Sequence, residues 1–502
     1  MKTVIPLNTK NNHYLYFTEN KILSICHPLL YEMIEIFNKN NYENSNQLEP
    51  YLVKLEEKYN EKEVSYYFNL LKLYEKSGCF ENTLLAGKFM GRIEDQELAK
   101  LIANIKQVTF EITERCNLEC EYCGYGELYD GYAPRQRKNL PSNYAINLID
   151  YLSKYWNSND NASHDRPTHI SFYGGEPLLN IKFIEDVVSH CNNLNLKHND
   201  LIFSMTTNAV LLKKHIDFFV KHDFHILISL DGDQANHSYR KFSDGTNSHQ
   251  VVIDNISYVQ DNYPEFFEKR ISFNAVLHNR NSIDEITNYI EKTFGKIPAI
   301  GELSTSGISK ENQNQFWQTY NNFNECLHES ENYESLTEKL FMTTPDGRYL
   351  TNFLMKSIYY NKDDYNDLIY EKRRIFSPTG TCSPFSKKIF VTAQGSLLAC
   401  ERIEHKYALG KVDDTGVNID FSKIKDLYNI NYDKMYKLCS KCYNSTNCVQ
   451  CMFFLDLDKK KVNCNGFTGY ENYRKQLQNI MIYLEEHPEK KHEIQEKYVF
   501  SF

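Results

Sequence analysis

Three closely spaced cysteines are the residues of this chain best suited to chemistry. Cys116, Cys120 and Cys123 have the spacing CxxxCxxC and follow an alternating apolar run, Val108, Phe110 and Ile112, which predicts a β-strand. Iron–sulfur clusters are held by cysteine thiolates, so three thiolates on one loop can hold three irons of a [4Fe–4S] cluster. The fourth iron then remains open to a small chelating ligand.

Three other interpretations of these cysteines are open. Structural zinc takes four ligands, usually as two closely spaced pairs, whereas this loop offers three thiols. Disulfides belong to secreted proteins, and the residues after Met1 lack the apolar region and cleavage site of a signal peptide. Burial as ordinary apolar side chains is the commonest fate of free cysteines. The motifs farther along the chain favour the cluster.

Strand-like and helix-like patterns alternate between about residues 108 and 303. Such alternation implies parallel strands with helices outside them. The strand patterns lie at residues 108–113, 169–173, 201–206, 225–230 and 271–277, with a weaker sixth at 300–303. Helical patterns separate them at residues 144–156, 181–191, 211–221, 251–260 and 283–293. The sequence alone permits a partial barrel, a full barrel or an open sheet.

Glycines and polar side chains follow the second, third and fourth of these strands, where a parallel barrel places its active site. They are Gly174, Gly175, Glu176, Asn208, Ser229, Asp231 and, slightly later, Arg240. Glycines let the backbone approach a ligand, and a guanidinium binds a carboxylate bidentately. The alternatives are a plain turn for the glycines, helix capping for Ser229 and Asp231, and a surface salt bridge for Arg240.

Together these motifs resemble the radical S-adenosylmethionine (SAM) enzymes, an α/β family built on a partial (β/α)6 barrel. The resemblance implies that the amino and carboxylate groups of SAM chelate the open iron. One electron from the cluster then cleaves SAM into methionine and a 5′-deoxyadenosyl radical, which abstracts a hydrogen from the substrate. The resemblance assigns Tyr122 to the adenine, Glu176 to the SAM amino group, and Ser229 and Arg240 to further SAM contacts, Arg240 at the carboxylate. Asn208 and Asp231 are additional candidates for the same site.

A second group of cysteines lies near the C-terminal end. Seven of the 14 cysteines of the chain fall between residues 382 and 464. The segment resembles the SPASM extension, named after the maturation of subtilosin, pyrroloquinoline quinone, sulfatases and mycofactocin. The resemblance implies two auxiliary [4Fe–4S] clusters, so three in all. The outer one would be held by Cys439, Cys442, Cys448 and Cys464, and the inner one by Cys382, Cys400 and Cys451.

The C-terminal pattern departs from the family in one respect. Cys448 and Cys451 are separated by two residues, where three are usual. The alternative for this segment is one or two zinc-ribbon sites, because CxxC pairs suit Zn²⁺.

Glu401 directly follows Cys400. In sulfatase-maturing relatives a carboxylate just after this cysteine acts as the base on the substrate radical. A base near a cluster suits an oxidation, which removes a proton as well as electrons. The alternative is an exposed glutamate at the end of a hairpin, and His405 is a weaker candidate.

The first 94 residues are predicted to form a separate domain. Strand-like runs at residues 13–18 and 21–26, split by Glu19 and Asn20, predict a hairpin. Helical patterns follow at residues 29–37, 48–59 and 64–75, and the last ends near Gly78. This order resembles the winged-helix domain of ribosomal-peptide maturases, which captures a leader peptide as an added strand. The alternative is a structural cap on the next domain.

Composition narrows the class of protein. The 502 residues carry a net charge of −9, which argues against a nucleic-acid or anionic-lipid footprint. No apolar run has the length of a membrane span. We therefore expect a cytoplasmic protein with neither nucleic acid nor membrane as a partner.

These observations predict a radical SAM/SPASM oxidoreductase that modifies a ribosomally made precursor peptide, by a thioether or carbon–carbon crosslink. Its expected partners are the leader of that peptide and an electron donor such as flavodoxin or ferredoxin. Two alternatives are open: an anaerobic sulfatase-maturing enzyme that forms formylglycine, and a zinc-containing peptide-binding scaffold with a degenerate barrel. The predicted domains are a winged-helix-like domain, the barrel, a helical linker, the SPASM domain and a terminal helix, at residues 1–94, 95–309, 310–375, 376–470 and 471–502.

Overall fold

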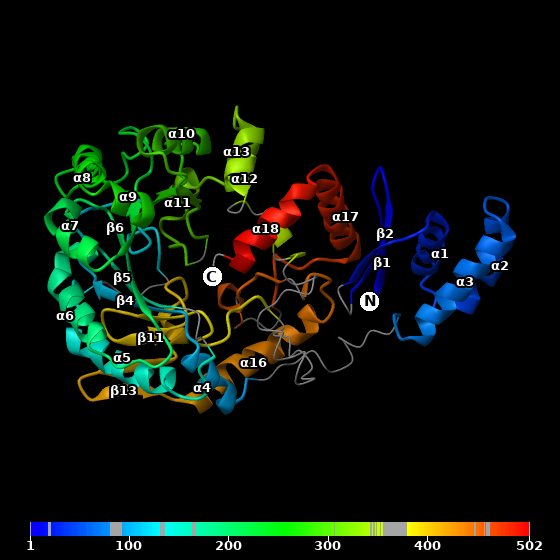
Figure 1. Cartoon of the computed structure of the whole chain (residues 1–502), viewed down its shortest axis with the longest axis horizontal. Coiled ribbons are helices and arrows are strands. Elements are labelled where there is room, and N and C mark those ends of the chain that lie inside the picture. The colour runs from blue at the N-terminus through cyan, green and yellow to red at the C-terminus, as the bar shows by residue number, and fades with distance from the viewer. Residues whose placement is uncertain are drawn as a thin grey trace. The chain divides into compact units, whose positions relative to one another are not determined.

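A computed structural model gives the fold of the chain (Figure 1). It describes residues 2–18, 22–80, 93–130, 136–162, 167–305, 307–341, 379–445, 448–455 and 462–500, with the single positions 344, 347, 349–351, 353, 354 and 457; the side chains of residues 495–500 are not described. The described residues fall into two compact units. One, the sheet unit, comprises residues 93–347 and 382–427, and the other, the terminal unit, comprises residues 1–92, 348–381 and 428–502.

The sheet unit is built on a ten-stranded sheet with the order β13-β12-β11-β10-β4-β5-β6-β7-β8-β9. Six neighbouring strands pair in parallel from β4 to β9. Their bounds are β4 Gln107–Thr113, β5 Thr168–Gly174, β6 Leu201–Thr207, β7 His225–Ser229, β8 Ile271–Val276 and β9 Ala299–Gly301. The sequence-based strand assignments are therefore confirmed to within a few residues, and the sheet is open in its strand order.

Helices connect these parallel strands and lie along one side of the sheet in Figure 1. They are α5 Ser142–Trp156, α6 Ile181–Asn192, α7 Leu212–Lys221, α8 His249–Asn262, α9 Pro264–Arg270 and α10 Ile283–Phe294. Helix α10 shows why such helices form where they do. Its cap, Ser282, accepts a hydrogen bond from the Glu285 N–H, and Gly295 ends it at a φ of 67°.

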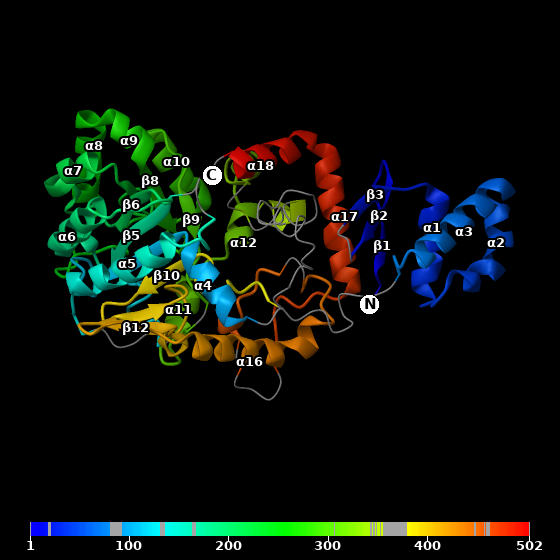
Figure 2. The ribbon, with the colours of Figure 1, turned by 60° about the horizontal axis from the view of Figure 1, so that its bottom comes forward.

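A second group of strands extends the sheet beyond β4. These are β10 Lys388–Val391, β11 Ser396–Leu398, β12 Gly410–Asp413 and β13 Gly416–Ile419 (Figure 2). Each of the first three pairs antiparallel with the next strand along the chain. Strand β10 pairs in parallel with β4, with Val391 opposite Phe110. The hairpin of β10 and β11 therefore belongs to the same sheet as β4, the strand that leads into the CxxxCxxC segment.

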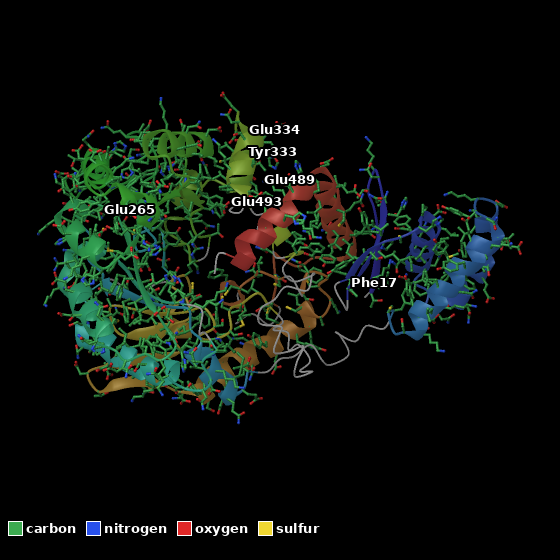
Figure 3. The ribbon with its side chains drawn as sticks, in the orientation of Figure 1. Phe17, Glu265, Tyr333, Glu334, Glu489 and Glu493 are labelled. Atoms are coloured by element: carbon green, nitrogen blue, oxygen red, sulfur yellow. The ribbon has the colours of Figure 1, made fainter. Side chains whose placement is uncertain are left out.

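The terminal unit contains a three-stranded antiparallel sheet in the order β1-β2-β3. Its strands are β1 Val4–Asn8, β2 His13–Phe17 and β3 Ile22–Ile25, followed by α1 Pro28–Lys39, the 3₁₀ turn Ser45–Leu48, α2 Glu49–Glu56 and α3 Glu61–Lys76. The predicted hairpin and three helices are confirmed, although Glu19 and Asn20 lie outside the described residues. Phe17, labelled in Figure 3, packs edge-on against Tyr74 of α3 at 5.6 Å.

The C-terminal helix α17, Tyr470–Glu486, packs on this small sheet. Glu485 accepts hydrogen bonds from Thr9, Asn12 and Tyr14 at the turn between β1 and β2. The segment predicted as a terminal helix at residues 471–502 holds two helices, because α17 ends at Glu486 and α18 Pro488–Phe500 follows it.

The remaining described elements are α4 Asp95–Ala103, α11 Gln313–Thr319, α12 Phe323–His328, α13 Tyr333–Lys339, the 3₁₀ turns Pro177–Asn180, His405–Tyr407 and Met452–Phe454, and α16 Phe421–Cys439. Residues 355–375, predicted as part of a helical linker, and residues 376–378, at the start of the predicted SPASM domain, lie outside the described part of the chain. Where the chain is described, no helix combines the length and the apolar character needed to cross a membrane.

Candidate functional site

A cavity of about 780 Å³ opens at the carboxyl ends of the parallel strands. It is lined by the loop that follows β4, which carries Cys116, Cys120 and Cys123, and by residues just after β5, β6 and β7. Its lining includes Tyr122, Gly174, Gly175, Glu176, Asn208, Ser229, Arg240 and Glu401. The fold therefore gathers most of the sequence-predicted site residues around one space, as expected for a parallel α/β sheet.

The cysteine loop presents three thiols to this cavity, and none of them forms a disulfide. Burial raises the pKa of the Cys120 thiol to about 12; the Arg240 charge lowers it, and the thiols of Cys123 and Cys116 raise it further. Three thiols this close resist ionising together unless a cation compensates their charge. The donor set thus fits a cationic iron centre, which binds thiolates.

The two glycines at the end of β5, Gly174 and Gly175, are required by the cysteine loop itself. A Cβ on Gly175 would lie 2.1 Å from the carbonyl oxygen of Arg115, and Gly174 adopts a φ of 132°. The Gly175 N–H donates to Thr113 at 2.8 Å, and the Glu176 N–H donates to Arg115 at 2.9 Å. The glycine motif therefore lets the β5 end pack directly against the chain that leads into Cys116.

Glu176 is a buried carboxyl at the edge of the cavity. It accepts hydrogen bonds from the Leu178 N–H at 3.0 Å, the Thr207 hydroxyl at 2.7 Å and the Asn208 N–H at 2.8 Å. Burial outweighs these bonds, which lower the pKa, so the pKa of Glu176 rises to about 7. A cation entering the cavity beside it would favour the charged carboxylate.

Asp231 is the centre of a buried ionic network behind the cysteine loop. It forms a bidentate pair with Arg240, with Nε to Oδ2 at 2.9 Å and Nη2 to Oδ1 at 3.0 Å. Tyr122 donates its hydroxyl to the same carboxylate, and the Val276 N–H donates to Oδ1 at 2.9 Å. Burial alone would raise the pKa of Asp231, but Arg240 and its hydrogen-bond donors hold it well below its usual value.

This network limits how Asp231 and Arg240, two of the predicted site residues, can contact a ligand. Asp231 does not appear in the cavity wall, whereas Arg240 does. Two of the five N–H donors of the Arg240 guanidinium are already used by Asp231. A ligand carboxylate at Arg240 would therefore have to use the donors that remain.

Asn208 and Ser229 lie on neighbouring strand ends. Asn208 donates from Nδ2 to Asn117 at 2.8 Å and lies 3.8 Å from the Cys116 sulfur. Ser229 donates to Asn274 of β8 at 3.2 Å. Asn208 thus contacts the cysteine loop directly, and both side chains line the cavity.

Sequence reasoning missed His278. This fully buried ring follows β8, stacks on Tyr122 at 5.4 Å and has Nε2 3.8 Å from an oxygen of Asp231. It packs edge-on against Tyr239 at 4.8 Å. The only signal in the sequence is a histidine directly after a predicted strand, which by itself says little.

Comparison with known families identifies the segment that forms this cavity. Residues 110–293 match the model of the radical SAM superfamily. The chain contains a radical SAM domain. The matched residues run from β4 to α10, so the fold of this part is the α/β radical SAM fold with a large sheet.

Two proteins that contain similar sequence illustrate how much of this chain its relatives share. The radical SAM cyclopropyl synthase TigE of Paramaledivibacter caminithermalis is 24% identical over 352 residues, 69% of this chain and 66% of that protein. An uncharacterized protein of Methanocaldococcus jannaschii is 33% identical over 147 residues, 29% of this chain and 45% of that protein. The chain thus spans less than two thirds of either relative.

Solved structures resemble the chain more loosely. Native anSMEcpe with bound AdoMet is 17% identical, covers 78% of this chain and 99% of its own, and has a TM-score of 0.48. SuiB of Streptococcus suis bound to S-adenosylmethionine is 14% identical, covers 94% of this chain and 98% of its own, and has a TM-score of 0.39.

Glu401 reaches the cavity of the radical SAM domain from the hairpin of β10 and β11. Its carboxylate pairs with Lys388 at 3.0 Å and lies 3.5 Å from the Cys400 sulfur. Burial disfavours its charge, but Lys388 and nearby hydrogen bonds outweigh burial and lower the pKa of Glu401. The predicted base is therefore held as a carboxylate next to the cavity.

Four C-terminal cysteines surround a small cavity of their own in the terminal unit. Its lining includes the thiols of Cys439, Cys442, Cys448 and Cys464. Burial raises the pKa of Cys439 to about 12, and the three other thiols raise it further. The four residues assigned by resemblance to the outer cluster are thus neighbours in space.

The cysteines assigned to the inner cluster are divided between the units. Cys382 and Cys400 belong to the sheet unit, and Cys451 belongs to the terminal unit. Their assignment to one cluster remains a prediction. Among the described residues, no three His, Cys, Asp or Glu side chains are arranged to share a single metal ion.

Proposed function

We propose that this chain is a radical SAM enzyme that oxidatively modifies a peptide. The observation that carries the proposal is the single 780 Å³ cavity, which brings three thiols of one loop together with Glu176, Ser229 and Arg240. The donor chemistry of the thiols fits an iron–sulfur cluster, and the cavity has the size of a cofactor and substrate site. When bound, the cluster with SAM would supply a carbon-centred oxidant that removes a hydrogen atom.

The residues around the cavity have complementary roles in this proposal. Cys116, Cys120 and Cys123 hold the cluster, and the Glu176 carboxylate pairs with the ammonium group of SAM. Arg240 offers its unused N–H donors to the SAM carboxylate, while Asp231 fixes the orientation of the guanidinium. Tyr122 lies next to the adenine of SAM in this proposal, and its hydrogen bond to Asp231 holds the ring in place. Gly174 and Gly175 allow the β5 end to reach the loop.

The C-terminal cysteines extend the proposal to an oxidation. Cys439, Cys442, Cys448 and Cys464 would hold an outer [4Fe–4S] cluster, and Cys382, Cys400 and Cys451 an inner one. The four cysteines of the outer set line one small cavity, which supports their assignment to one cluster. Electrons removed from the substrate would leave through these clusters, and an external donor such as flavodoxin or ferredoxin would supply the electron that starts each cycle.

Glu401 is proposed as the base that takes the substrate proton. A base has to be deprotonated before it can act, and the Lys388 ion pair keeps Glu401 charged. The carboxylate lines the same cavity as the cysteine loop. It can therefore reach a substrate bound there.

The peptide substrate is proposed to be captured by the sheet β1-β2-β3. The outer edge of β1 is closed, since the Val4 carbonyl accepts from Asn38 at 2.8 Å and the Pro6 carbonyl accepts from Arg474 at 2.9 Å. Strand β3 is the opposite edge, and its Ile22 and Ile25 side chains are 44% and 68% exposed. An extended leader peptide could pair with this edge as a fourth strand.

Anaerobic reconstitution with iron and sulfide tests the proposal. We expect the protein to release methionine and 5′-deoxyadenosine when SAM and dithionite are added, and Cys120→Ala to abolish the release. Cys326→Ala is the matched control, because Cys326 is half-buried and lies outside both cysteine groups. A protein that takes up zinc and little iron, and leaves SAM intact, would overturn the proposal in favour of a scaffold.

A further inference from the structure

A second hollow lies beside the site cavity, along the strands of the large sheet. It has a volume of about 310 Å³ and is lined by side chains of β4, β5, β6, β7, β8 and β10. We call it the hydroxyl hollow because Thr109, Ser171 and Ser204 form part of its wall. Thr109 pairs with Ser171, Ser171 with Ser204, and Ser204 with His225 in the strand registers.

These four residues form one polar row across four parallel strands. The Ser171 and Ser204 hydroxyls are 2.5 Å apart, and Gln107 donates to Ser171 at 2.8 Å. Layers of side chains inside a barrel of parallel strands are normally filled by Val, Ile and Leu, which pack into a dry core. A row of small hydroxyls leaves space instead, and polar space of this volume takes up water or a polar ligand.

The hollow adjoins the site cavity. Tyr173, Thr206, Leu227 and Glu401 line both spaces. A group that enters the site cavity from the carboxyl ends of the strands can therefore extend past Thr206 into the hollow. This makes the hollow part of the substrate path and not an isolated void.

The charges in its wall are already matched. Arg270 pairs with Asp223 through contacts of 2.6 and 2.5 Å, and Lys388 pairs with Glu401 at 3.0 Å. His225 accepts from Arg270 at 3.0 Å, and burial together with the Arg270 charge lowers its pKa, so it is neutral. An ionised ligand group would find no counter-ion left over, whereas an uncharged polar group needs none.

Thr109 adds an independent sign of a ligand. It is 5% exposed, and within the described residues its hydroxyl has no hydrogen-bond partner. A buried hydroxyl without a partner is unfavourable, and Thr109 lines the hollow. A ligand with both a donor and an acceptor would satisfy it.

We propose that the hydroxyl hollow is a subsite for an uncharged polar side chain of the substrate peptide, the amide of Asn or Gln or the hydroxyl of Ser or Thr. The proposal rests on the proposed function, because the side chain enters next to the residue that reacts in the site cavity. It predicts that the modified residue is flanked by such a polar residue. An acidic or basic neighbour is excluded by the matched charges of the wall.

Small probes test the subsite without any SAM chemistry. Saturation-transfer NMR on the full-length protein, purified without oxygen, would use acetamide as the neutral probe and acetate as the anionic one. We expect acetamide to bind at least about tenfold more tightly than acetate. Ser204→Leu fills the hollow and should abolish acetamide binding, whereas Ser189→Leu on the outer face of α6 should leave it unchanged.

Thr109→Val covers the case in which the leucine variant fails to fold. It removes the unpaired hydroxyl at nearly constant size and should weaken acetamide binding about two- to tenfold, the worth of one hydrogen bond. Equal binding of acetate and acetamide, or binding unaffected by both variants, would overturn the proposal, as would a hollow that takes up water alone. SAM cleavage can fail while acetamide still binds, so the two proposals fail separately.

Discussion

Asp231 and Arg240 form a buried bidentate ion pair in the loop after β7, with N–O distances of 2.9 and 3.0 Å. The same carboxylate accepts the Tyr122 hydroxyl from the cysteine loop and the Val276 N–H from β8. One side chain thus joins three segments that the chain brings together at the cavity. Its loss would release the guanidinium and Tyr122 at the same time.

We predict that Asp231→Asn destabilises the protein strongly. Removing one partner of a buried pair leaves the other charge uncompensated, which costs about 3–5 kcal/mol. Urea denaturation of the cluster-free protein measures the change. Asp231→Leu combined with Arg240→Met should regain most of the loss, because it removes both charges.

An exposed ion pair provides the control for this prediction. Glu265, labelled in Figure 3, pairs with Lys269 of α9 at 2.6 Å, and both side chains are largely exposed. Glu265→Gln should leave the urea midpoint nearly unchanged, because solvent screens such pairs. An equal loss in the two single variants would show that burial of the Asp231 pair is not what stabilises it.

The sheet of the radical SAM domain could be predicted because strands such as β4 alternate apolar and polar residues, with Val108, Phe110 and Ile112 buried on one face. Strand β1 was missed because Pro6 argues against a strand. The structure places it at a sheet edge, where a missing N–H costs nothing. The pairing of β10 with β4 joins residues about 280 positions apart, and no local pattern encodes it.

The cysteines and the strand-end residues of the candidate site could also be read from spacing. The contacts that these side chains make with one another could not be predicted in this way. The Arg240 guanidinium was expected to face a ligand carboxylate, yet Asp231 takes its bidentate face. His278 lies against Tyr122 only because β8 ends beside the cysteine loop. Such contacts depend on tertiary distances, which single-sequence patterns do not contain.

Glu176 should make stability depend on pH. Burial raises its pKa from 4.5 to about 7, so the folded state binds this proton more tightly than the unfolded chain. The stabilisation is complete below about pH 4 and is lost as pH rises through 7, a change of about 3 kcal/mol. Chemical denaturation of the cluster-free protein from pH 5 to 8 measures the slope.

Glu176→Gln is the matched variant for this slope. Its side chain does not titrate, so its stability should fall less than that of the wild type between pH 5 and 8. The baseline stability of the variant is not the readout, because the amide also alters the hydrogen bond to the Asn208 N–H. Parallel slopes for the two proteins would rule out Glu176 as the titrating group.

The outer cysteine set should determine part of the iron content. If three [4Fe–4S] clusters are present, the reconstituted wild type carries about 12 irons per chain, and Cys442→Ala should lower this to about eight. Iron and sulfide analysis after reconstitution measures it. Cys191→Ala, a buried cysteine of α6, is the control and should keep the wild-type content. Unchanged iron in Cys442→Ala would remove the outer cluster from the proposal.

Glu401 should separate SAM cleavage from substrate oxidation. Glu401→Gln removes the base but leaves the three cysteines of the β4 loop intact. We expect 5′-deoxyadenosine release to continue while peptide modification falls by about 10²–10⁴, the usual contribution of general-base catalysis. Mass spectrometry of peptide and nucleoside from one reaction gives both numbers. Glu404→Gln, three residues further along the chain, is the control and should leave SAM cleavage and peptide modification near wild type. An equal loss of both products in Glu401→Gln would argue for a structural role of Glu401.

The edge strand β3 should decide whether a leader peptide binds. A peptide added as a strand would bury Ile25, which is 68% exposed. It would pair with the backbone of Leu23 and Ile25, because the Cys26 N–H bonds to His13 of β2 and alternate residues of a strand bond to opposite neighbours. Ile25→Asp places a charge on this contact, so we expect peptide affinity to fall by at least about tenfold with little loss of stability, since the position is exposed. Fluorescence anisotropy with a labelled precursor peptide encoded beside the gene measures the affinity.

Val53→Asp is the control for the β3 variant, because Val53 is 69% exposed on α2, away from the sheet edge. It adds the same charge to the same unit and should leave peptide affinity unchanged. The closed edge of β1 supplies a second comparison: Arg474→Lys loosens the contact with the Pro6 carbonyl without touching β3. If Ile25→Asp bound the peptide as well as Val53→Asp, capture at β3 would be excluded, and the small sheet would be left as a cap packed on α17.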